Sequence, residues 1–447
     1  MAGLKEDPTS GGGLPEARVD QFTRPVAQFL RIEALSGILL ALATIAALVA
    51  ANGGAYEAWT DFWNVKFSVG FGEHALDKPL WWWVNDGLMV VFFFVVGLEI
   101  KREIVDGHLA DRRALMLPLA AAIGGAVVPA VIFYLVEGGT PGARGWAIPM
   151  ATDIAFVVGC LALLGSRVPP GLKVFVLSLA IVDDLIAVLV IAIFYTEKLA
   201  LLWLAASAIG IAAVVLLQKL GVRRIGIYVV LGAAIWLATY NSGIHPTVAG
   251  VVLGVLTPIG AWVSRPSIRE VMRTTATAID EAEARGTRAH LALERLAFAA
   301  REARSPLDRL EYRLHPWVSF MIMPIFALAN AAVPVTVEGL ADPLSLAIAI
   351  GLFAGKPIGI TLAALVVIKT GQATLPRGVG WGAILGAGVL SGTGFTMSLF
   401  IGGLAFPGQP ELLDAARTGI LLGSGVSIAV GMAVLFFALK RPGERAA

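Results

Sequence analysis

Residues 174–194 read VFVLSLAIVDDLIAVLVIAIF, an apolar run interrupted by a single pair of charged side chains, Asp183 and Asp184. About 20 apolar residues in a helix cross the hydrocarbon core of a bilayer, so this run is long enough to span a membrane. A helix rises about 1.5 Å per residue, which puts both carboxylates near the middle of the span. The stretch therefore predicts a membrane protein that keeps charge deep in the bilayer.

The composition of the whole chain agrees with this interpretation. Of its 447 residues, 57% are hydrophobic and only 15% are charged, whereas a soluble domain carries about 25% charged residues. The net charge is only +2, so the chain does not have the strongly basic composition that is typical of a nucleic-acid-binding protein. The single cysteine, Cys160, excludes an internal disulfide framework.

Twelve segments are apolar and long enough, or nearly so, to be membrane spans. We place them at 33–51, 82–104, 114–136, 146–164, 172–196, 199–217, 225–240, 245–259, 317–332, 344–367, 378–404 and 412–438. The sequence thus predicts an all-α integral membrane fold with twelve transmembrane helices.

Lysine and arginine are unevenly distributed between the connecting segments. With the N-terminus inside, the inside segments carry 28 of the 34 basic residues and the outside loops carry 4. The remaining two, Lys356 and Arg417, lie within spans. Because cytoplasmic loops are enriched in Lys and Arg, we expect both termini in the cytoplasm.

Three of the segments outside the spans have a distinctive composition or pattern. Residues 1–31 are polar and are expected to form a disordered cytoplasmic tail before a single transmembrane domain at 32–440. The external loop 56–80 alternates apolar and polar residues over 63–71, which fits either a hairpin that pairs with a second copy or an ordinary polar loop. The cytoplasmic segment 263–314, rich in Ala, Arg and Glu, is expected to be a solvated helical segment, plain or regulatory.

Charged side chains near mid-membrane are the most informative signal. Each costs about 2.5–3.5 kcal/mol on insertion scales, so such residues persist where they face a partner or a cavity. Asp153 in the fourth span, Asp183 and Asp184 in the fifth and Lys356 in the tenth are all expected near the midplane. They would then share one site, in which Lys356 is either a permanent counter-charge or itself a proton carrier.

Two of these spans contain residues that interrupt a helix. Pro149 precedes Asp153 in the fourth span, and four glycines fall within 386–394 of the eleventh. Each interrupted span is second in a group of three. We therefore expect spans 3–5 and 10–12 to be inverted-topology repeats with two interrupted crossing helices, a pattern that marks the binding site of many secondary transporters.

Acidic oxygens deep in a membrane suit a small hard cation, which prefers oxygen ligands. Protons compete for the same oxygens, so the residues favour a cation/proton antiporter. Two alternatives stay open. An intramembrane aspartyl protease would need its carboxylates on separate facing helices, and a proton-coupled organic anion transporter would need more fixed positive charge than Lys356 supplies.

Six motifs, in this order, resemble the NhaA family of sodium/proton antiporters over about residues 30–438. They are VNDGLM at 84–89, GLEIKRE at 97–103, ATDIAF at 151–156, AIVDDL at 180–185, GKP at 355–357 and SGTGFT at 391–396. The resemblance implies a pH-regulated, electrogenic antiporter of a bacterial inner membrane that exports Na⁺ or Li⁺ in exchange for protons by alternating access. It further implies a homodimer formed through the external hairpin, with no cofactor and no enzymatic activity.

The resemblance also implies roles for individual residues. Asp183 and Asp184 would bind Na⁺ and protons, and Lys356 would pair with Asp183 when no sodium is bound. Asp153 and Lys356 would balance the partial charges where the broken helices cross, with Thr152 contributing to the cation site. The other implied residues are the accessory Asp86 and, for pH regulation, Glu99, Arg102, Glu103, Glu311, His315 and His245.

The chain departs from the family pattern in two places. Tyr312 stands where well-studied members carry a titratable histidine, so the implied pH profile does not carry over directly. The 263–314 segment is longer than expected for the family, and its role stays open. Judged by its neighbours alone, His245 also fits a packed or capping histidine.

Overall fold

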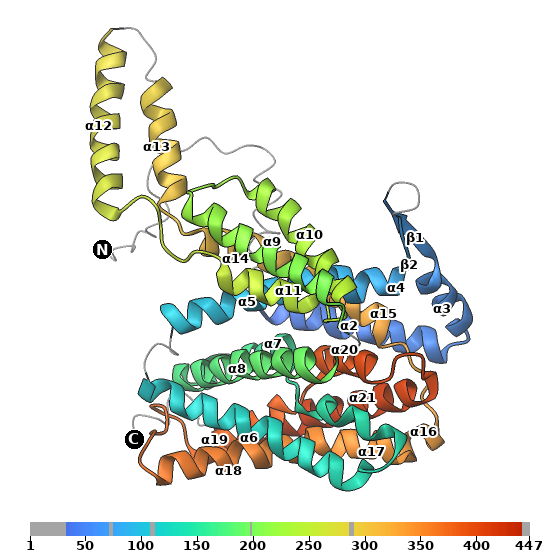
Figure 1. Ribbon diagram of the computed structural model, residues 1–447. Coiled ribbons are helices and arrows are strands. Elements are labelled where there is room, and N and C mark those ends of the chain that lie inside the picture. Colours follow the sequence, from blue (N-terminus) through green and yellow to red (C-terminus); the bar gives the residue numbers. More distant parts are fainter. Residues whose placement is uncertain (1–32, 71–74, 108–111, 197–198, 286–289, 440–447) are drawn as a thin grey trace.

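The computed structural model describes residues 33–70, 75–107, 112–196, 199–285 and 290–439. Figure 1 shows long helices that run along a common direction, with a β-hairpin at one end and two helices that cross the other end. The predicted tail, 1–31, lies outside the described residues.

The first half of the chain is helical apart from one β-hairpin, among the described residues. Its elements are α2 (Glu33–Asn52), α3 (Tyr56–Asn64), β1 (Lys66–Val69), β2 (Leu76–Pro79), α4 (Leu80–Trp82), the π-helical turn η2 (Trp83–Leu88), α5 (Met89–Val105), α6 (Arg112–Glu137), the 3₁₀ helix η4 (Pro141–Met150), α7 (Ile154–Leu164), the 3₁₀ turn η5 (Gly165–Arg167) and α8 (Pro170–Phe194).

The second half is also helical in the described residues. Its elements are α9 (Leu201–Lys219), α10 (Ile225–Ser242), α11 (Thr247–Leu256), α12 (Arg265–Ala284), α13 (His290–Glu302), α14 (Pro306–Trp317), the π-helical turn η6 (Val318–Ile322), α15 (Met323–Asn330), α16 (Val337–Ala341), α17 (Pro343–Ile350), the π-helical turn η7 (Gly351–Gly355), α18 (Lys356–Lys369), α19 (Trp381–Ser391), α20 (Phe395–Ala405) and α21 (Pro410–Ala438).

Among the described residues, eight helical segments are long and apolar enough to cross a membrane, and the bent pair α19–α20 makes a ninth. The prediction of an all-α membrane protein is confirmed. The other three predicted spans coincide with helices that are short or that follow a π-helical turn, namely α5 after η2, α11, and α15 after η6.

Glycines let two pairs of helices approach closely. A Cβ on Gly97 of α5 would lie 2.5 Å from the carbonyl oxygen of Val251 in α11. A Cβ on Gly359 of α18 would lie 2.0 Å from the carbonyl oxygen of Gly124 in α6. Small residues at such contacts are typical of membrane helices, where packing of backbone against backbone replaces the hydrophobic drive of water.

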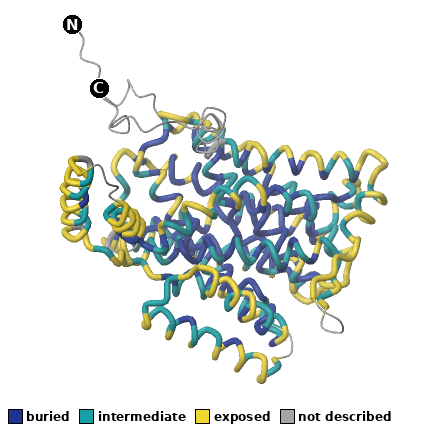
Figure 2. Tube along the Cα trace, turned by 90° about the horizontal axis from the view of Figure 1, so that it is seen from above, coloured by how far each residue is buried: buried dark blue, intermediate teal, exposed yellow. Residues whose placement is uncertain are grey.

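The outer helices present apolar side chains on the surface of the molecule. Only 11% of the residues in the apolar stretch of α9, and 22% of those in α10, are buried inside the molecule. Figure 2 shows the buried residues gathered in the centre of the bundle and the exposed ones around it. Apolar surface of this kind is expected to contact lipid, because hydrocarbon tails are as apolar as the side chains.

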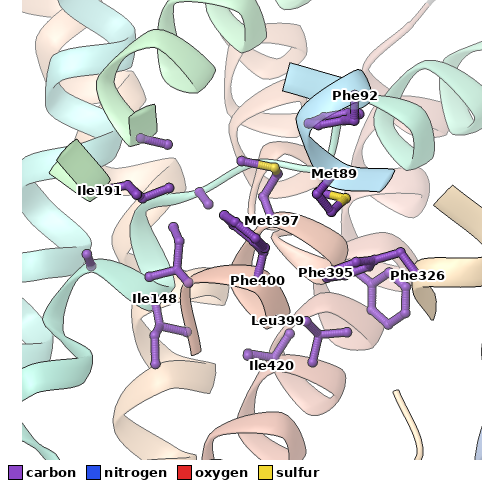
Figure 3. Packing of buried hydrophobic residues seen from close by; sticks show 14 of the residues in the cluster. Met89, Phe92, Ile148, Ile191, Phe326, Phe395, Met397, Leu399, Phe400 and Ile420 are labelled. Atoms are coloured by element: carbon purple, nitrogen blue, oxygen red, sulfur yellow. The ribbon is translucent and has the colours of Figure 1, made fainter. Parts of the chain in front are cut away.

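A cluster of large apolar side chains fills the middle of the bundle. Figure 3 shows Met397 and Phe400 of α20 between Ile148 of η4 and Met89 of α5. The Phe400 ring also lies 6.3 Å from that of Phe326 in α15, centroid to centroid. This packing fixes α20 in the centre of the molecule, next to the interruptions described next.

Both predicted interruptions are present. Residues 151–153 separate η4 from α7, and residues 392–394 separate α19 from α20, which are bent by 44°. Only Gly392 and Gly394 of the four glycines lie at the second break. Gly386 and Gly388 lie within α19, where they allow Leu435 and Pro357 to pack closely against the helix.

The loop after α3 contains a two-stranded antiparallel hairpin in which Lys66 pairs with Pro79 and Val69 with Leu76. The sequence pattern placed the beginning of the strand too early. Trp63 and Asn64 end α3, since Trp63 packs edge-on against Trp59 and Phe62 of that helix.

The segment after α11 forms a helical hairpin, α12–α13, followed by α14. The hairpin is joined to the bundle at Glu302, whose carbonyl oxygen accepts hydrogen bonds from the backbone N–H groups of Trp262 and Val263. Its two helices run across the direction of the spans (Figure 1). All three helices lie within the segment 263–317.

Candidate ion-binding site

A buried ion pair lies at the centre of the bundle. Lys356 Nζ, at the start of α18, is 2.6 Å from Asp183 Oδ2 of α8, and their side chains are 0% and 1% exposed. The ammonium also donates to Thr152 Oγ1, at 2.5 Å. Residues that are 173 positions apart in the sequence are therefore buried together next to the first interruption.

Thr152 joins the two broken helices. Its hydroxyl accepts the hydrogen bond from Lys356 and donates to the carbonyl oxygen of Ser391, at 3.0 Å. Because Ser391 is the last residue of α19, its carbonyl carries part of the negative charge at that helix end. The Lys356 ammonium is thus linked to this helix end through one hydroxyl group.

Asp153 caps two helices at once. Oδ1 accepts from the backbone N–H groups of Ala155 and Phe156 at the start of α7, at 3.1 and 3.3 Å. Oδ2 accepts from the backbone N–H of Thr396 at the start of α20, at 3.0 Å, and from the Thr396 hydroxyl. A carboxylate at these positions offsets the partial positive charge of both N-termini.

Asp184 differs from its neighbour in having no partner. The residue is 3% exposed, and no hydrogen bond or ion pair joins it to another described residue. The charged groups near it are Asp183, Glu99, Asp153 and Lys356. One oxygen of Asp183, Oδ1, also lacks a hydrogen-bond partner among the described residues. Two neighbouring, buried carboxylates therefore have oxygens that are not used by other described residues, as a site for a small cation requires.

A second polar pair lies at the end of the bundle that carries the β-hairpin. His245 Nε2 is 3.3 Å from Asp86 Oδ1, and His245 Nδ1 is 2.7 Å from the Thr247 hydroxyl. The backbone N–H of Thr247 also points at Nδ1, at 3.4 Å, which assigns the ring hydrogen to Nε2. The indole N–H of Trp236 donates to the Asp86 carbonyl oxygen.

The predicted pH-regulation residues of α5 and α14 face each other at the opposite end. Arg102 of α5 pairs with Glu311 of α14 and, at 3.0 Å, with Asp308. Burial raises the pKa of the Glu311 carboxyl above its ordinary value, and Arg102 opposes this shift only in part. Glu99 of α5 is close enough to Arg102 and Glu311, and also to Asp184, to interact with their charges.

The structure places the remaining predicted residues less centrally. Glu103 lies on α5, one residue beyond Arg102 and partly buried, and His315 is an exposed residue of α14. Neither is brought to the Asp183–Lys356 pair. Asp86 and His245 contact each other directly, which no pattern in the sequence predicted.

Three residues of these clusters were missed in the sequence. Thr396, Thr247 and Asp308 each complete a predicted residue's hydrogen bonds. A hydroxyl residue just after a glycine-rich interruption was the available signal for Thr396. The free N–H groups of a helix N-terminus attract an acceptor such as Asp153, to which a nearby hydroxyl can also donate. No pattern in the sequence indicates the other two contacts.

Comparisons with known proteins agree with this geometry. The family model described as Na⁺/H⁺ antiporter 1 matches residues 27–435. The chain belongs to this family. Its relatives include a protein of Rhodopirellula baltica named Na⁺/H⁺ antiporter NhaA, 47% identical over 96% of this chain and 97% of the relative.

Other members of the Na⁺/H⁺ antiporter 1 family are similarly close. The NhaA of Rhizobium meliloti is 45% identical over 97% of this chain and 98% of its own. NhaA 2 of Acidiphilium cryptum is 46% identical over 95% and 94%, respectively. The expected family is confirmed, and the chain is a membrane transporter rather than an enzyme.

Proposed function

We propose that this protein exports Na⁺ or Li⁺ in exchange for protons, with Asp183 and Asp184 as the shared site. The observation that carries the proposal is the unpartnered Asp184 beside the Asp183–Lys356 ion pair. A cation is expected to take up the free oxygens of Asp184 and Asp183, with the Thr152 hydroxyl as a neutral ligand. Family membership supports the same cargo, because the similar proteins are named as Na⁺/H⁺ antiporters.

Exchange follows from competition for these oxygens. Na⁺ bound at Asp183 draws the carboxylate away from Lys356, so the ammonium loses the partner that offsets its burial. Its proton can then leave, as can a proton from Asp184. Two protons released for one Na⁺ bound would make the exchange electrogenic. The site holds either the cation or the protons, and alternating access moves it between the two sides of the membrane.

For the architecture, we propose twelve spans with two inverted repeats. The first repeat would be α6, η4–α7 and α8, and the second α17–α18, α19–α20 and α21. The position of each interruption, second in its group of three, supports this division. The two breaks contact each other, since the backbone N–H of Asp153 donates to the carbonyl oxygen of Thr393 at 2.6 Å.

For regulation, we propose that two groups of residues link pH to transport. Glu99 is close enough to Arg102 and Glu311, and also to Asp184, to interact with their charges. This supports a coupling of the Arg102–Glu311 pair, with Glu103 and His315 on the same helices, to Asp184. The His245–Asp86 pair is the second group. The His245 ring lies 5.2 Å from that of Phe400, whose helix α20 begins at the Asp153 cap.

We further propose that the protein lies in a bacterial inner membrane with both termini cytoplasmic and dimerises through the external hairpin. The excess of Lys and Arg on one side supports this orientation. Strand β1 is exposed along its whole length and can pair with a second copy. Replacing 66–79 by a short Gly-Ser linker should then give monomers in native mass spectrometry.

The exchange is tested by trapping a pH-sensitive dye in proteoliposomes and adding Na⁺. Wild type is expected to move protons in response to Na⁺, and Asp184→Asn is not. Elution of Asp184→Asn as a monodisperse protein on gel filtration would show that the variant is folded. Asp77→Asn, in the exposed hairpin, is the control and should respond like wild type. A Na⁺ response retained by Asp184→Asn would overturn the assignment of the site.

A further inference from the structure

A groove on the surface of the bundle lies between α6, η4 and α8. Its volume is about 490 Å³, which is within the usual range for a ligand pocket. All the side chains that line it are apolar or aromatic. Most of them belong to α6, from Ala126 to Leu135, and the others are Trp146 and Met150 of η4 and Ile186 and Val190 of α8.

The groove opens toward the lipid that surrounds the spans. Val127, Val131 and Leu135 follow one another at intervals of four residues, so they lie on one side of α6. They are 53%, 52% and 80% exposed, respectively. Both α6 and α8 are long and apolar enough to cross a membrane, and Figure 1 shows them side by side. An apolar hollow between such helices therefore has hydrocarbon rather than water at its opening.

The length of the groove matches the thickness of one leaflet. The stretch of α6 from Ala126 to Leu135 is about 14 Å long, and half of a hydrocarbon core is about 15 Å. The deep end, at Met150 and Ile186, lies close to mid-membrane, because Met150 directly precedes the first interruption and Ile186 lies two positions after Asp184. The shallow end, at Leu135, is in the last turn of α6. One acyl chain of the adjacent leaflet therefore fits along the groove.

A basic side chain lies at the shallow end of the groove. In a 3₁₀ helix such as η4, residues three positions apart lie above one another, so Arg144 is on the same side as Met150. It lies about 12 Å from Met150 along the helix axis, at the level where headgroups begin. Arg144 is exposed and forms no ion pair with another described residue. Glu137, the closest acidic residue in the sequence, is 4% exposed, and its carboxylate accepts a hydrogen bond from the Thr140 hydroxyl. The Arg144 guanidinium is therefore available to a phosphate group.

Aromatic side chains from three elements gather at the same end. Trp146 of η4 packs edge-on against Phe194 of α8, with ring centres 5.2 Å apart. The Tyr195 hydroxyl donates to the carbonyl oxygen of Arg144 at 2.8 Å, which joins η4 to the end of α8. Tyr134 of α6 lines the groove and is 63% exposed. Trp and Tyr are enriched at the level where acyl chains meet headgroups, so this end of the groove has the composition of a membrane interface.

We propose that this groove binds a phospholipid, with one acyl chain along Ala130 and Met150 and with the phosphate on Arg144. In the orientation proposed above, the lipid belongs to the outer leaflet. A chain in the groove contacts η4, which ends at the first interruption, and α8, which carries Asp183 and Asp184. The bound lipid therefore supports both elements that position the ion site. The inference does not depend on which ion the protein transports, because it concerns the surface in contact with the bilayer.

Native mass spectrometry of the delipidated full-length protein, titrated with phosphatidylglycerol, tests the site. Wild type is expected to retain one phosphatidylglycerol after weaker adducts have dissociated. Arg144→Gln should raise the apparent dissociation constant about fivefold, the contribution of one basic residue to binding an anionic lipid, and Arg144→Lys should raise it less. Ala130→Phe fills the groove and should abolish retention. Ala206→Phe, at an exposed position of the outer helix α9, is the matched control and should behave like wild type.

Two partial ligands separate the contributions of the chain and the phosphate. Glycerol phosphate has the phosphate without chains, and diacylglycerol has the chains without phosphate, so each should be retained more weakly than phosphatidylglycerol. Retention of glycerol phosphate as strong as that of the lipid would overturn the proposal, because the acyl chain would then contribute nothing. Equal retention of phosphatidylglycerol by wild type and by Ala130→Phe that elutes as a monodisperse protein would also overturn it.

A photoreactive lipid locates the bound chain. In nanodiscs, phosphatidylglycerol with a diazirine at the end of one chain should label peptides that contain Met150 or Ile186 more strongly than the exposed peptides of α9. Ala130→Phe should remove this excess and leave the labelling of α9 unchanged. Equal labelling of both surfaces in wild type would show only the surrounding bilayer and would overturn the proposal. Excess labelling that disappears in discs holding two copies would overturn it as well, because a second protein molecule would then occupy the groove.

Discussion

Lys356 Nζ lies 2.6 Å from Asp183 Oδ2 in a place where neither side chain reaches solvent. Removing one member of such a pair leaves the other charge buried without compensation, at a cost of about 3–5 kcal/mol. We therefore expect Lys356→Met to lower the melting temperature of the purified protein markedly in detergent.

The paired replacement distinguishes loss of the charge pair from loss of packing. Asp183→Leu/Lys356→Met removes both charges, so it should recover most of the stability that Lys356→Met loses while abolishing Na⁺-driven proton movement. A double variant no more stable than the single one would show that the ion pair is not what the substitution disturbs.

Thr396 is expected to stabilise the interruption through its hydroxyl group. Thr396→Val keeps the backbone hydrogen bond to Asp153 but loses the hydroxyl donor. Hydrogen bonds to a charged group contribute about 1.5–3 kcal/mol, so unfolding should require correspondingly less denaturant. Thr396→Ser should restore the wild-type midpoint.

The chain offers a matched control for this substitution. Thr361, in α18, has a buried hydroxyl without a hydrogen-bond partner among the described residues. Thr361→Val should therefore leave the midpoint unchanged or raise it. Equal losses for the variants at 361 and 396 would mean that the Asp153 contact contributes nothing of its own.

Gly392 should not tolerate a methyl group. A Cβ there would lie 2.3 Å from the carbonyl oxygen of Leu352 and 2.7 Å from Ser427 Oγ, so backbone must move. We expect Gly392→Ala to destabilise the protein by about 1–3 kcal/mol, as overpacking does. Gly403→Ala is the comparison, because a Cβ at that position meets nothing within 4 Å. A melting temperature unchanged by Gly392→Ala would show that the break after α19 can move away from η7 and α21 without cost.

Glu311 should make stability depend on pH. Burial raises the pKa of its carboxyl in the folded protein despite Arg102. The stabilisation by the protonated form is complete below the ordinary glutamate pKa and is lost as pH rises through the folded value. The melting temperature of wild type relative to Glu311→Gln should therefore fall as pH rises from acid toward neutral.

Asp77 should make stability change with pH in the direction opposite to that of Glu311. The Ser68 hydroxyl, at 2.7 Å, is the main cause that lowers the pKa of the Asp77 carboxyl, and Lys66 adds to it. Its stabilisation is present above the ordinary aspartate pKa and is lost as pH falls through the folded value. The melting temperature of wild type relative to Asp77→Asn should therefore fall on acidification. If this difference changed with pH in the same direction for Asp77→Asn and Glu311→Gln, the two assignments would be contradicted.

Much of the membrane fold was predictable because apolar runs and isolated charges act over short stretches of sequence. The runs around Asp183 and Lys356 gave the spans, and Pro149 and Gly392 marked the two breaks. The depth of Asp183 and Lys356 in the membrane was also predictable, because the rise per residue of a helix converts a position in a span into a distance along it.

Contacts between distant segments were not predictable in the same way. The Thr396 bond to Asp153 depends on how the two broken segments cross. The Asp86–His245 contact depends on how η2 packs against the turn before α11. The start of the external strand was missed because Trp63 alternates with its neighbours in the sequence yet packs within a helix. Side-chain packing across elements overrode the local pattern there.

The π-helical turn η7 ends at Gly355, directly before Lys356. Such a turn holds one residue more than the α-helical turn it replaces, so everything after it is rotated by about 100° relative to a regular helix. That single additional residue determines the direction in which the Lys356 side chain leaves the helix axis. A chain shortened by one position between 351 and 355 would have an equally apolar span, yet its lysine would face a different neighbour, and the aspartate on α8 would be left alone.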